Sequence, residues 1–438
     1  MKFSLAYSMK RYRYPLLALL SALLIACTAS WSPSQAQLQP EQARSADSFV
    51  NSIGVATHLR YVDTAYGNYD TIIRPKLQEL GVRHIRDGGK NSEFYRRLND
   101  LATLGIKSTL VMDSRDGITP ANVVAEAIQP VLSSIEAVEG PNEWDVNPQA
   151  TYKNQAFPEG LRAYQDELYA AVKADPTTAA LPVLMPSLAI PYYAPRLGSL
   201  ASADLGNMHS YAGGNLPSQD LDTKWVPLTQ AVTGVAKPIV ATECGWHNAT
   251  SDLKASQPGI SELAAAKYVP RLYLEYFNRG IQRSFLYELI NERQGTTQEQ
   301  NFGLLRNNGS AKPAFDSLKN LIALLKDPGS EFAPQALSYS LSGSSAPLSP
   351  AVHHTLLQKR DGRFYLALWQ EVSSFDLQTK LDVYVPQQTV TVTLGTRVRQ
   401  ATTYKPLASV APVQRYANPK QLNLTISDHP LVIELVPA

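Results

Sequence analysis

Short apolar runs alternate with longer amphipathic segments over most of the chain, between residues 49 and 328. The runs have the length of buried strands, whereas the longer segments repeat their apolar residues at helical spacing. In segment 69–81, for example, Ile72, Leu77 and Leu80 share one side, and Gly81 stands where a glycine often ends a helix. The apolar runs are 52–59, 82–88, 107–113, 135–143, 181–188, 205–211, 237–246 and 283–289.

This order of elements predicts an α/β fold, a (β/α)8 TIM barrel over residues 49–328, because such a barrel consists of eight strand-then-helix repeats. A Rossmann-type sheet is the alternative, but no G-x-G-x-x-G motif follows an early strand. In a barrel, reactive side chains lie at the carboxyl ends of the strands. The polar residues near the ends of the apolar runs are His58, Arg86, Asp113, Asn142, Glu143, His209, Tyr211, Glu243 and Glu288.

A different pattern begins near residue 329 and continues to residue 438. Short runs of alternating apolar and polar residues, such as 363–370 and 389–394, are separated by turn residues, and helix signals are absent. Alternation with a period of two is typical of strands that have one buried face. We therefore expect a second, all-β domain, a small sandwich that follows the barrel.

The first 36 residues have the pattern of an export signal. Basic residues end at Arg13, and the apolar run from Tyr14 to Cys27 is short for a membrane span. Residues 24–27 resemble a bacterial lipobox, which would make a membrane-anchored lipoprotein at Cys27. Cleavage after Ala36 would instead release the protein, and an uncleaved anchor is the third outcome. Each outcome predicts export to the periplasm, the membrane surface or the medium, with the polar residues 37–48 as a linker.

The charge of the chain changes once the export signal is set aside. The whole sequence has 40 basic and 38 acidic residues, and the signal holds four of the basic residues and no acidic residue. The remaining 36 basic and 38 acidic residues give a net charge of −2, which offers no support for nucleic-acid binding. The 22 tyrosines suit sugar ligands as well as ordinary packing in a β-rich domain.

Sequence motifs for metals, nucleotides and serine or cysteine nucleophiles are absent. The chain has no H-E-x-x-H, no cysteine pair at zinc spacing, no EF-hand loop, no P-loop and no G-x-S-x-G elbow. Cys27 lies in the export signal, so Cys244 has no partner for an intramolecular disulfide. Alternation along its strand turns Cys244 away from the side on which Glu243 lies. We therefore expect no metal and no cofactor.

Two glutamates have the spacing that glycosidic bond hydrolysis needs, with an acid at the leaving oxygen and a carboxylate across the anomeric carbon. Glu143 ends the fourth apolar run and Glu243 lies near the end of the seventh, and these positions face each other across a barrel. Asn142 can bind a sugar 2-hydroxyl beside Glu143. Trp144 can supply an apolar wall that raises the pKa of a general acid.

With these residues in place, the barrel resembles the clan A glycoside hydrolases, whose signatures are Asn-Glu at the end of strand four and Glu at the end of strand seven. The resemblance covers roughly residues 49–328, and the trailing β domain makes it most similar to family 39 and related exopolysaccharide-active glycosidases. It implies that Glu143 is the acid/base and Glu243 the nucleophile. It also implies that Asn142 contacts the 2-hydroxyl, that Tyr211 is the partner of the nucleophile, and that Arg86 lies near it.

One departure from this resemblance concerns strand eight. Many clan A members end this strand with a tryptophan that forms the floor of the −1 subsite, whereas this chain offers Tyr287 or Glu288. Further candidate sugar contacts are His58, His209, Trp246, Glu288 and Asp113, the indole of Trp246 as a stacking platform. Ion pairs, helix caps and core packing are the structural alternatives for these side chains.

The sequence therefore predicts an exported, retaining β-glycoside hydrolase that acts on a polysaccharide or oligosaccharide without a cofactor, and we expect a monomer. Two alternatives remain open at this point. One is a barrel that binds glycans without turning them over, and the other is a transglycosylase that uses the same residues.

Overall fold

The computed structural model describes residues 38–343 and 348–438. The predicted export signal, with the alternatives at Cys27 and Ala36, lies outside the described residues. The sequence predicts a linker over residues 37–48. Their described part instead forms two strands, β1 (Gln39–Gln42) and β2 (Arg44–Ser45). β1 pairs with β11 (Ala336–Gly343) and β2 with β12 (Val352–Gln358) of the second domain. Polar edge strands are held by backbone hydrogen bonds, so their side chains carry little sequence signal.

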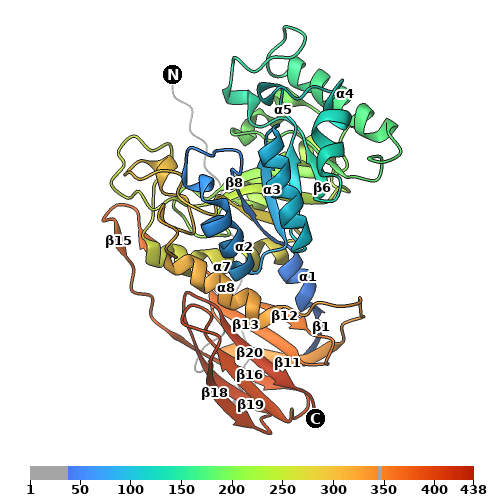
Figure 1. Ribbon diagram of the computed structural model, residues 1–438. Helices are drawn as coiled ribbons and strands as arrows, with labels where there is room; N and C mark the ends of the chain where they lie inside the picture. Colours follow the sequence, from blue (N-terminus) through green and yellow to red (C-terminus); the bar gives the residue numbers. More distant parts are fainter. Residues whose placement is uncertain (1–37, 344–347) are drawn as a thin grey trace, which may run out of the picture. The chain divides into compact units, whose positions relative to one another are not determined.

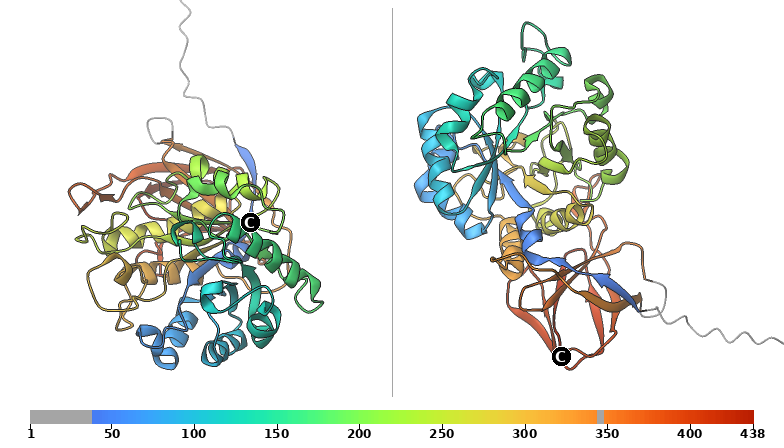
Figure 2. Two further views of the ribbon diagram at one scale, coloured as in Figure 1. Left: turned by 90° about the horizontal axis from the view of Figure 1, so that it is seen from above. Right: turned by 90° about the vertical axis from the view of Figure 1, so that its right-hand side faces the viewer.

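Eight parallel strands form the barrel that the apolar runs predict (Figure 1, Figure 2). The hydrogen-bonded order is β7-β6-β5-β4-β3-β10-β9-β8, and a parallel bridge between Leu184 and Leu205 brings the region of β8 back to β7. The bounds are β3 (Ile53–Ala56), β4 (His84–Gly88), β5 (Lys107–Val111), β6 (Ile135–Glu139), β7 (Val183–Leu184), β8 (Gly206–Tyr211), β9 (Ile239–Gly245) and β10 (Arg283–Leu286).

The helices follow or separate these strands in the sequence, except α1, which precedes β3, and they pack on the barrel through their apolar faces. A short π-helical turn, Val123–Ile128, replaces a regular helix between β5 and β6. The helices are α1 (Ala46–Asn51), α2 (Arg74–Leu80), α3 (Ser92–Thr103), α4 (Glu159–Ala174), α5 (Ala194–Leu197), α6 (Val226–Thr233), α7 (Glu262–Asn278) and α8 (Pro313–Leu325).

The second domain contains two sheets, antiparallel except for the parallel pair of β2 and β12, and a small hairpin, which confirms the predicted β-sandwich. One sheet has the order β1-β11-β16-β19, and the other the order β18-β17-β20-β13-β12-β2. The hairpin consists of β14 (Phe375–Asp376) and β15 (Leu381–Asp382). The remaining strands are β11 (Ala336–Gly343), β12 (Val352–Gln358), β13 (Phe364–Gln370), β16 (Gln388–Leu394), β17 (Gln400–Tyr404), β18 (Pro412–Ala417), β19 (Gln421–Ile426) and β20 (Leu431–Val436).

Period-two burial shows how these strands form a core. Along β16, Val390, Val392 and Leu394 are buried while the residues between them are partly exposed. Leu366 and Ile433 of the opposite sheet belong to the same apolar cluster. Removing this apolar surface from water stabilises the domain, and the alternation of each strand fixes which face is inward.

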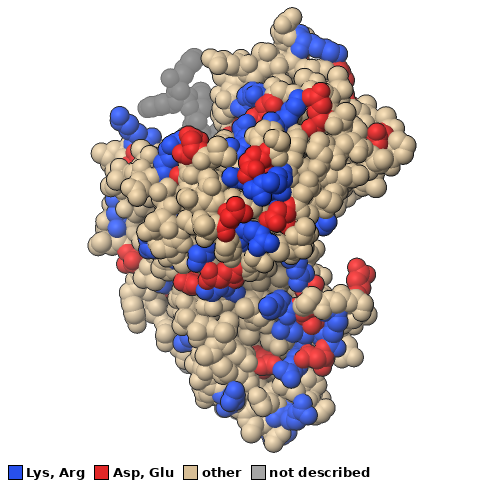
Figure 3. Space-filling model, viewed as in Figure 1, with Lys and Arg blue, Asp and Glu red and all other residues tan. Residues whose placement is uncertain are grey.

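The molecular surface mixes the two signs of charge. Figure 3 shows Lys and Arg interspersed with Asp and Glu on one face, without a large area of a single sign. Along the part of the chain that the structure describes, no helix combines the length and the apolar character needed to cross a membrane.

Candidate active site

Glu143 and Glu243 meet at one large cavity at the carboxyl ends of the barrel strands. The cavity has a volume of about 1010 Å³, and both glutamates line it. His209, from β8, lies between them, with its Nδ1 atom 2.6 Å from Oε1 of Glu143 and 3.6 Å from Oε2 of Glu243. One carboxylate oxygen of each glutamate lies within 4.8 Å of the other. The structure therefore brings together the two carboxylates that the sequence singles out.

Glu243 is held from two sides. Arg86 from β4 donates to its Oε1, and the hydroxyl of Tyr211 from β8 donates to its Oε2 at 2.7 Å. An arginine and a hydroxyl donor on different oxygens fix the orientation of a carboxylate. The contacts of Tyr211 and Arg86 therefore agree in position with the roles that the resemblance implies.

A buried carboxylate, Glu139, holds Arg86 in turn. Glu139 is 0% exposed and accepts from Nε and Nη2 of Arg86, each at 2.9 Å, and from Asn207 and Thr242, each at 3.1 Å. Although burial opposes it, the Arg86 guanidinium lowers the pKa of Glu139 to about 2. The sequence interpretation missed this residue, yet a glutamate at the end of a buried strand was itself a signal, since buried charges require partners.

Glu143 follows β6 in a left-handed backbone conformation, with φ of 52°. Burial raises the pKa of Glu143, but the neighbouring His209 imidazole outweighs burial and the net pKa is lowered. Burial likewise opposes the charge on His209, and the carboxylates of Glu243 and Glu143 raise the pKa of His209 to about 10. A protonated His209 donates from Nδ1 to Glu143 and from Nε2 to Thr242 at 3.1 Å.

The predicted role of Trp144, an apolar wall that raises the pKa of Glu143, is therefore wrong. Trp144 is buried outside the cavity, where its Nε1 donates to Oδ2 of Asp113 at 3.0 Å and its ring packs against Tyr164. Asp113 also accepts from the Asn142 backbone amide at 3.0 Å and pairs with Arg115. Asp113 thus lines the cavity as part of the scaffold that holds the Asn-Glu segment.

Asn142 lines the cavity with its amide group oriented by two donors. Its Oδ1 accepts from Arg86 Nη2 at 2.6 Å and from the Ser187 hydroxyl at 3.3 Å. This arrangement leaves the amide nitrogen as the end that can donate to a ligand. The position agrees with the predicted contact to a sugar 2-hydroxyl.

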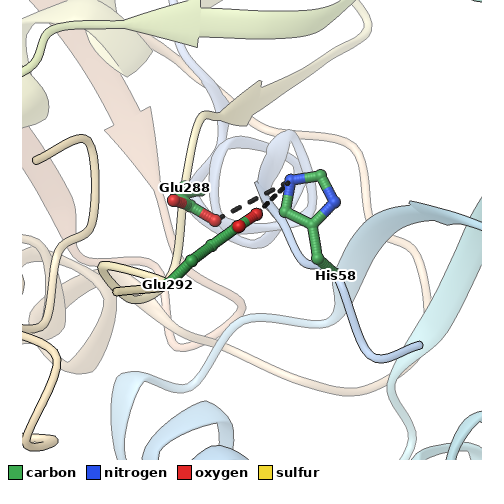
Figure 4. A group of neighbouring side chains, drawn as sticks. All are labelled: His58, Glu288 and Glu292. Carbon is green, nitrogen blue, oxygen red and sulfur yellow. Dashed lines mark ion pairs between the residues drawn. The ribbon is translucent and has the colours of Figure 1, made fainter. Parts of the chain in front are cut away.

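Tyr287 and Glu288 directly follow β10, the eighth strand of the barrel, and their side chains take different directions. Figure 4 shows Glu288 beside His58 and Glu292. Tyr287 lines the cavity, whereas Glu288 is 0% exposed and accepts from the Tyr66 hydroxyl at 2.9 Å. Burial raises the pKa of Glu288 well above its ordinary value, so this carboxyl is neutral. The predicted sugar contact of Glu288 is therefore wrong, because its carboxyl group lies behind the wall of the cavity.

His58 lines the same wall. Its Nε2 lies 3.2 Å from the Tyr287 hydroxyl, 3.8 Å from Oε2 of Glu288 and 3.7 Å from Oε1 of Glu292 (Figure 4). Burial, with Arg86 and Arg60 adding to it, lowers the pKa of His58 to about 3, so the ring is neutral. The ring stacks on Tyr61 at a centroid distance of 4.8 Å, which turns its edge toward the two carboxyl groups.

Two groups of described side chains bring possible metal-donor atoms within 4.8 Å of one another. One is Glu143, His209 and Glu243, where a protonated imidazole already supplies a positive charge and has no lone pair for a metal. The other is His58, Glu288 and Glu292, where tyrosine hydroxyls contact the imidazole and the buried carboxyl.

Trp246 does not reach the cavity. Its side chain is buried, packs against Tyr268 at 5.2 Å and donates from Nε1 to the carbonyl of Asn215 at 2.9 Å. The predicted stacking platform is therefore wrong, because the indole contributes to the core beside α7. Cys244 is turned away from the cavity as alternation predicts, and its thiol donates to the Phe285 carbonyl.

The aromatic lining of the cavity includes Tyr211, which the sequence interpretation selected, Tyr287, which it offered at strand eight, and three residues that it did not name. Tyr287 packs edge-on against Phe302 at 5.1 Å, and Tyr61 and Trp225 complete this set. Tyr61 and Phe302 lie in loops, where hydrophobic periodicity gives no information on direction, and Trp225 ends the short helical segment Leu221–Trp225 before α6.

Comparison with known proteins places the fold. No protein-family model matches the chain, and no curated protein matches it in sequence. Among solved structures, a family 39 glycoside hydrolase from Bacteroides cellulosilyticus WH2 has a TM-score of 0.59 at 17% identity, over 90% of this chain and 81% of that chain. A glucosidase from Croceicoccus marinus has a TM-score of 0.58 at 10% identity, over 92% and 99%.

A GH51 arabinofuranosidase from Xanthomonas axonopodis pv. citri has a TM-score of 0.56 at 14% identity, over 91% of this chain and 99% of that chain. All three similarities extend over the barrel and the β domain together. The resemblance expected from the sequence is thus confirmed for the fold: the chain has a barrel and a trailing β domain similar to those of the family 39 and GH51 structures.

Proposed function

We propose that this protein is a retaining β-glycoside hydrolase that acts on a polysaccharide or oligosaccharide. The observation that carries the proposal is the approach of a Glu143 oxygen within 4.8 Å of a Glu243 oxygen. Retaining enzymes hold their carboxyl groups about 5–5.5 Å apart, whereas inverting enzymes need about 6.5–9.5 Å to admit a water. The spacing supports a double displacement without a cofactor.

Glu243 is the nucleophile in this reaction. Arg86 and Tyr211 each bind one of its oxygens, so the carboxylate is oriented before the sugar arrives. Its attack on the anomeric carbon forms a glycosyl–enzyme ester and breaks the bond to the leaving oxygen. The amide nitrogen of Asn142 donates to the 2-hydroxyl, an interaction that strengthens as the oxocarbenium-like transition state forms.

Glu143 delivers the proton, and His209 supplies it. The 2.6 Å hydrogen bond between them provides the path. When Glu243 becomes an ester it loses its negative charge, which removes one of the two carboxylates that hold the proton on His209. The proton therefore moves through Glu143 to the leaving oxygen. In the second step Glu143 takes a proton from water, passes it to His209, and the ester is hydrolysed.

The cavity suits a neutral glycan. Its three lining arginines are already paired with carboxylates: Arg60 with Asp116, Arg115 with Asp113, and Arg86 with Glu139 and Glu243. Among the described lining residues, no arginine is left to pair with the acid group of a uronic sugar. Hydroxyl recognition by paired polar groups and aromatic side chains is the mode that this lining supports.

Two measurements test the proposed reaction. Proton NMR during cleavage of an aryl β-glycoside should show the β-anomer first, and a 2-fluoro glycoside should label Glu243 in a peptide digest. Release of the α-anomer first would contradict retention. A folded protein that binds a glycan but cleaves none of a broad β-glycan panel would be a glycan-binding barrel, and transfer products in place of hydrolysis would identify a transglycosylase.

We also propose that the protein is exported and lipidated at Cys27, on the lipobox pattern of residues 24–27. Mass spectrometry of the protein from bacterial membranes should show a diacylglyceryl group on Cys27, lost in Cys27→Ser. A soluble mature protein beginning at Gln37 would favour release by signal peptidase instead.

A further inference from the structure

The segment 212–220 connects two residues of the cavity wall. It begins directly after Tyr211, whose hydroxyl binds Glu243, and it leads to Trp225. A displacement of this segment would therefore reach the nucleophile through Tyr211. The contacts that hold it come from outside the barrel as well as from within it.

A carboxylate of the β domain holds one end of the segment. Glu371, which follows β13, accepts from the Ser218 backbone amide at 2.9 Å through Oε1. Its Oε2 lies 2.7 Å from Nη2 of Arg271, a fully buried residue of α7, and accepts from the Trp369 indole at 3.2 Å. Because Arg271 and Trp369 both hold Oε2, the carboxylate is fixed in place and presents Oε1 to the Ser218 amide.

The hairpin of the β domain holds the middle of the segment. Gly214 has a φ of +83°, and a Cβ atom there would lie 2.7 Å from Leu377 Cδ2 and 3.0 Å from the Pro258 carbonyl oxygen. Leu377 lies between β14 and β15, the latter labelled in Figure 1, and Asp382 of β15 is hydrogen-bonded to Ser261. The segment therefore packs between the hairpin and Pro258, next to Gln257 of the cavity wall.

The barrel supplies the third contact. The Trp246 indole donates to the Asn215 carbonyl at 2.9 Å, and Trp246 packs on Tyr268, whose hydroxyl accepts from the Ser374 amide of the β domain at 2.8 Å. Gly214, Asn215 and Ser218 are thus each fixed by a different side chain. Two of the three contacts come directly from the β domain.

We propose that the β domain completes the active site, with Glu371 and Leu377 as positioning residues that fix segment 212–220 and through it Tyr211. The consequence for catalysis rests on the proposed function, whereas the fixing of the segment does not. Loss of either contact loosens the segment, and the Tyr211 hydroxyl then spends less time on Glu243. We expect kcat to fall more than KM rises, because Tyr211 acts on the nucleophile.

Amide hydrogen exchange on the full chain tests the fixing directly. In Leu377→Ala and Glu371→Gln, peptides that cover 212–220 should exchange about tenfold faster or more, while strands of both domains keep their protection. The matched control is Leu381→Ala on the exposed side of the same hairpin, which should leave exchange unchanged. Equal exchange in Leu377→Ala and Leu381→Ala would overturn the proposal.

The catalytic consequence has a separate readout. On an aryl glycoside, Leu377→Ala should lower kcat about three- to tenfold with KM within about twofold, whereas Leu381→Ala should match the wild type. A merely stabilising contact would lower Tm and leave kcat of the folded protein unchanged, which would contradict the positioning role. If Glu371→Gln does not fold because Arg271 loses its partner, Leu377→Ala decides alone. If the wild type cleaves no glycan, hydrogen exchange still tests whether the β domain fixes segment 212–220.

Discussion

Two groups of one histidine and two glutamates lie in this barrel, and they differ in charge. Around His209, Arg86 binds Glu243, and the histidine is protonated between two carboxylates. Around His58, Tyr66 contacts Glu288 and Tyr287 contacts the imidazole, and the nearest arginines belong to other pairs. Burial keeps His58 and Glu288 neutral and raises the pKa of Glu292 to about 7. The same residue types thus acquire opposite protonation states from their neighbours, and only the charged group contains a carboxylate that can attack a substrate.

The largest expected difference between the two groups is in activity. Glu243→Gln and Glu143→Gln should each lower kcat/KM by about 10³-fold or more on a substrate with a poor leaving group. Glu292→Gln in the neutral group should stay within about twofold. Steady-state kinetics measure this contrast. A Glu243→Gln variant that retains a tenth of the wild-type activity would remove the distinction between the groups.

The next largest difference should be in the free energy of unfolding when each of the two buried glutamates, Glu139 and Glu288, is replaced. Glu139→Gln leaves the buried Arg86 without its bidentate partner, which should lower the free energy of unfolding by about 3–5 kcal/mol. Glu288→Gln replaces a neutral acid by a neutral amide that can still accept from Tyr66, so the change should be about 1 kcal/mol or less. Urea denaturation at pH 7 gives both values, and equal losses would show that Glu288 is charged.

The pH dependence of kcat/KM should reveal the proton on His209. Burial opposes the charge, yet Glu243 and Glu143 raise the pKa of His209 to about 10, so the acid pair keeps its proton into alkaline solution. In His209→Asn the proton depends on Glu143 alone, and the alkaline limb should move to lower pH by about one unit or more. The control His354→Asn in the β domain should keep the wild-type profile. If the alkaline limb of the kcat/KM profile does not shift in His209→Asn, the proposed proton transfer from His209 through Glu143 is excluded.

The smallest effect should come from Glu292. Burial raises the pKa of Glu292 from 4.5 to about 7, so the folded protein binds this proton more tightly than the unfolded chain does. Its favourable contribution is complete at low pH and is lost as the pH rises from about 4.5 through 7. Relative to wild type, Glu292→Gln should gain about 1–2 kcal/mol of stability between pH 5 and pH 8, after allowance for solvent screening. A pH-independent difference in urea denaturation would show that Glu292 titrates normally.

The sequence predicts the barrel and the two glutamates because both depend on strand periodicity. Glu143 and Glu243 follow apolar runs, and a closed barrel brings the ends of its strands together. Side-chain direction beyond a strand end does not follow from periodicity. Trp144 and Trp246 therefore turn into the core where sugar contacts or an apolar wall were predicted, and Tyr287 takes the cavity position beside the buried Glu288.

The partners of buried charged side chains cannot be predicted from the sequence either, because they come together only in the fold. Glu139 and Arg86 are 53 residues apart in the sequence and meet only in the folded barrel. The effect of His209 on the pKa of Glu143 likewise depends on a distance of 2.6 Å between their side chains. The strands at 39–45 escape prediction for another reason. Their side chains are polar, and the backbone pairing that defines them leaves no periodic pattern.

Those first strands also determine how the molecule would respond to mechanical load. β1 and β2 belong to the sheets of the β domain, and so does β20, the last strand, so the barrel is inserted between the first and last strands of one sandwich. Tension applied between the two ends of the described chain therefore enters the sandwich before it reaches the barrel. For a protein tethered through its N-terminal segment, the sandwich would yield before the strands of the barrel do.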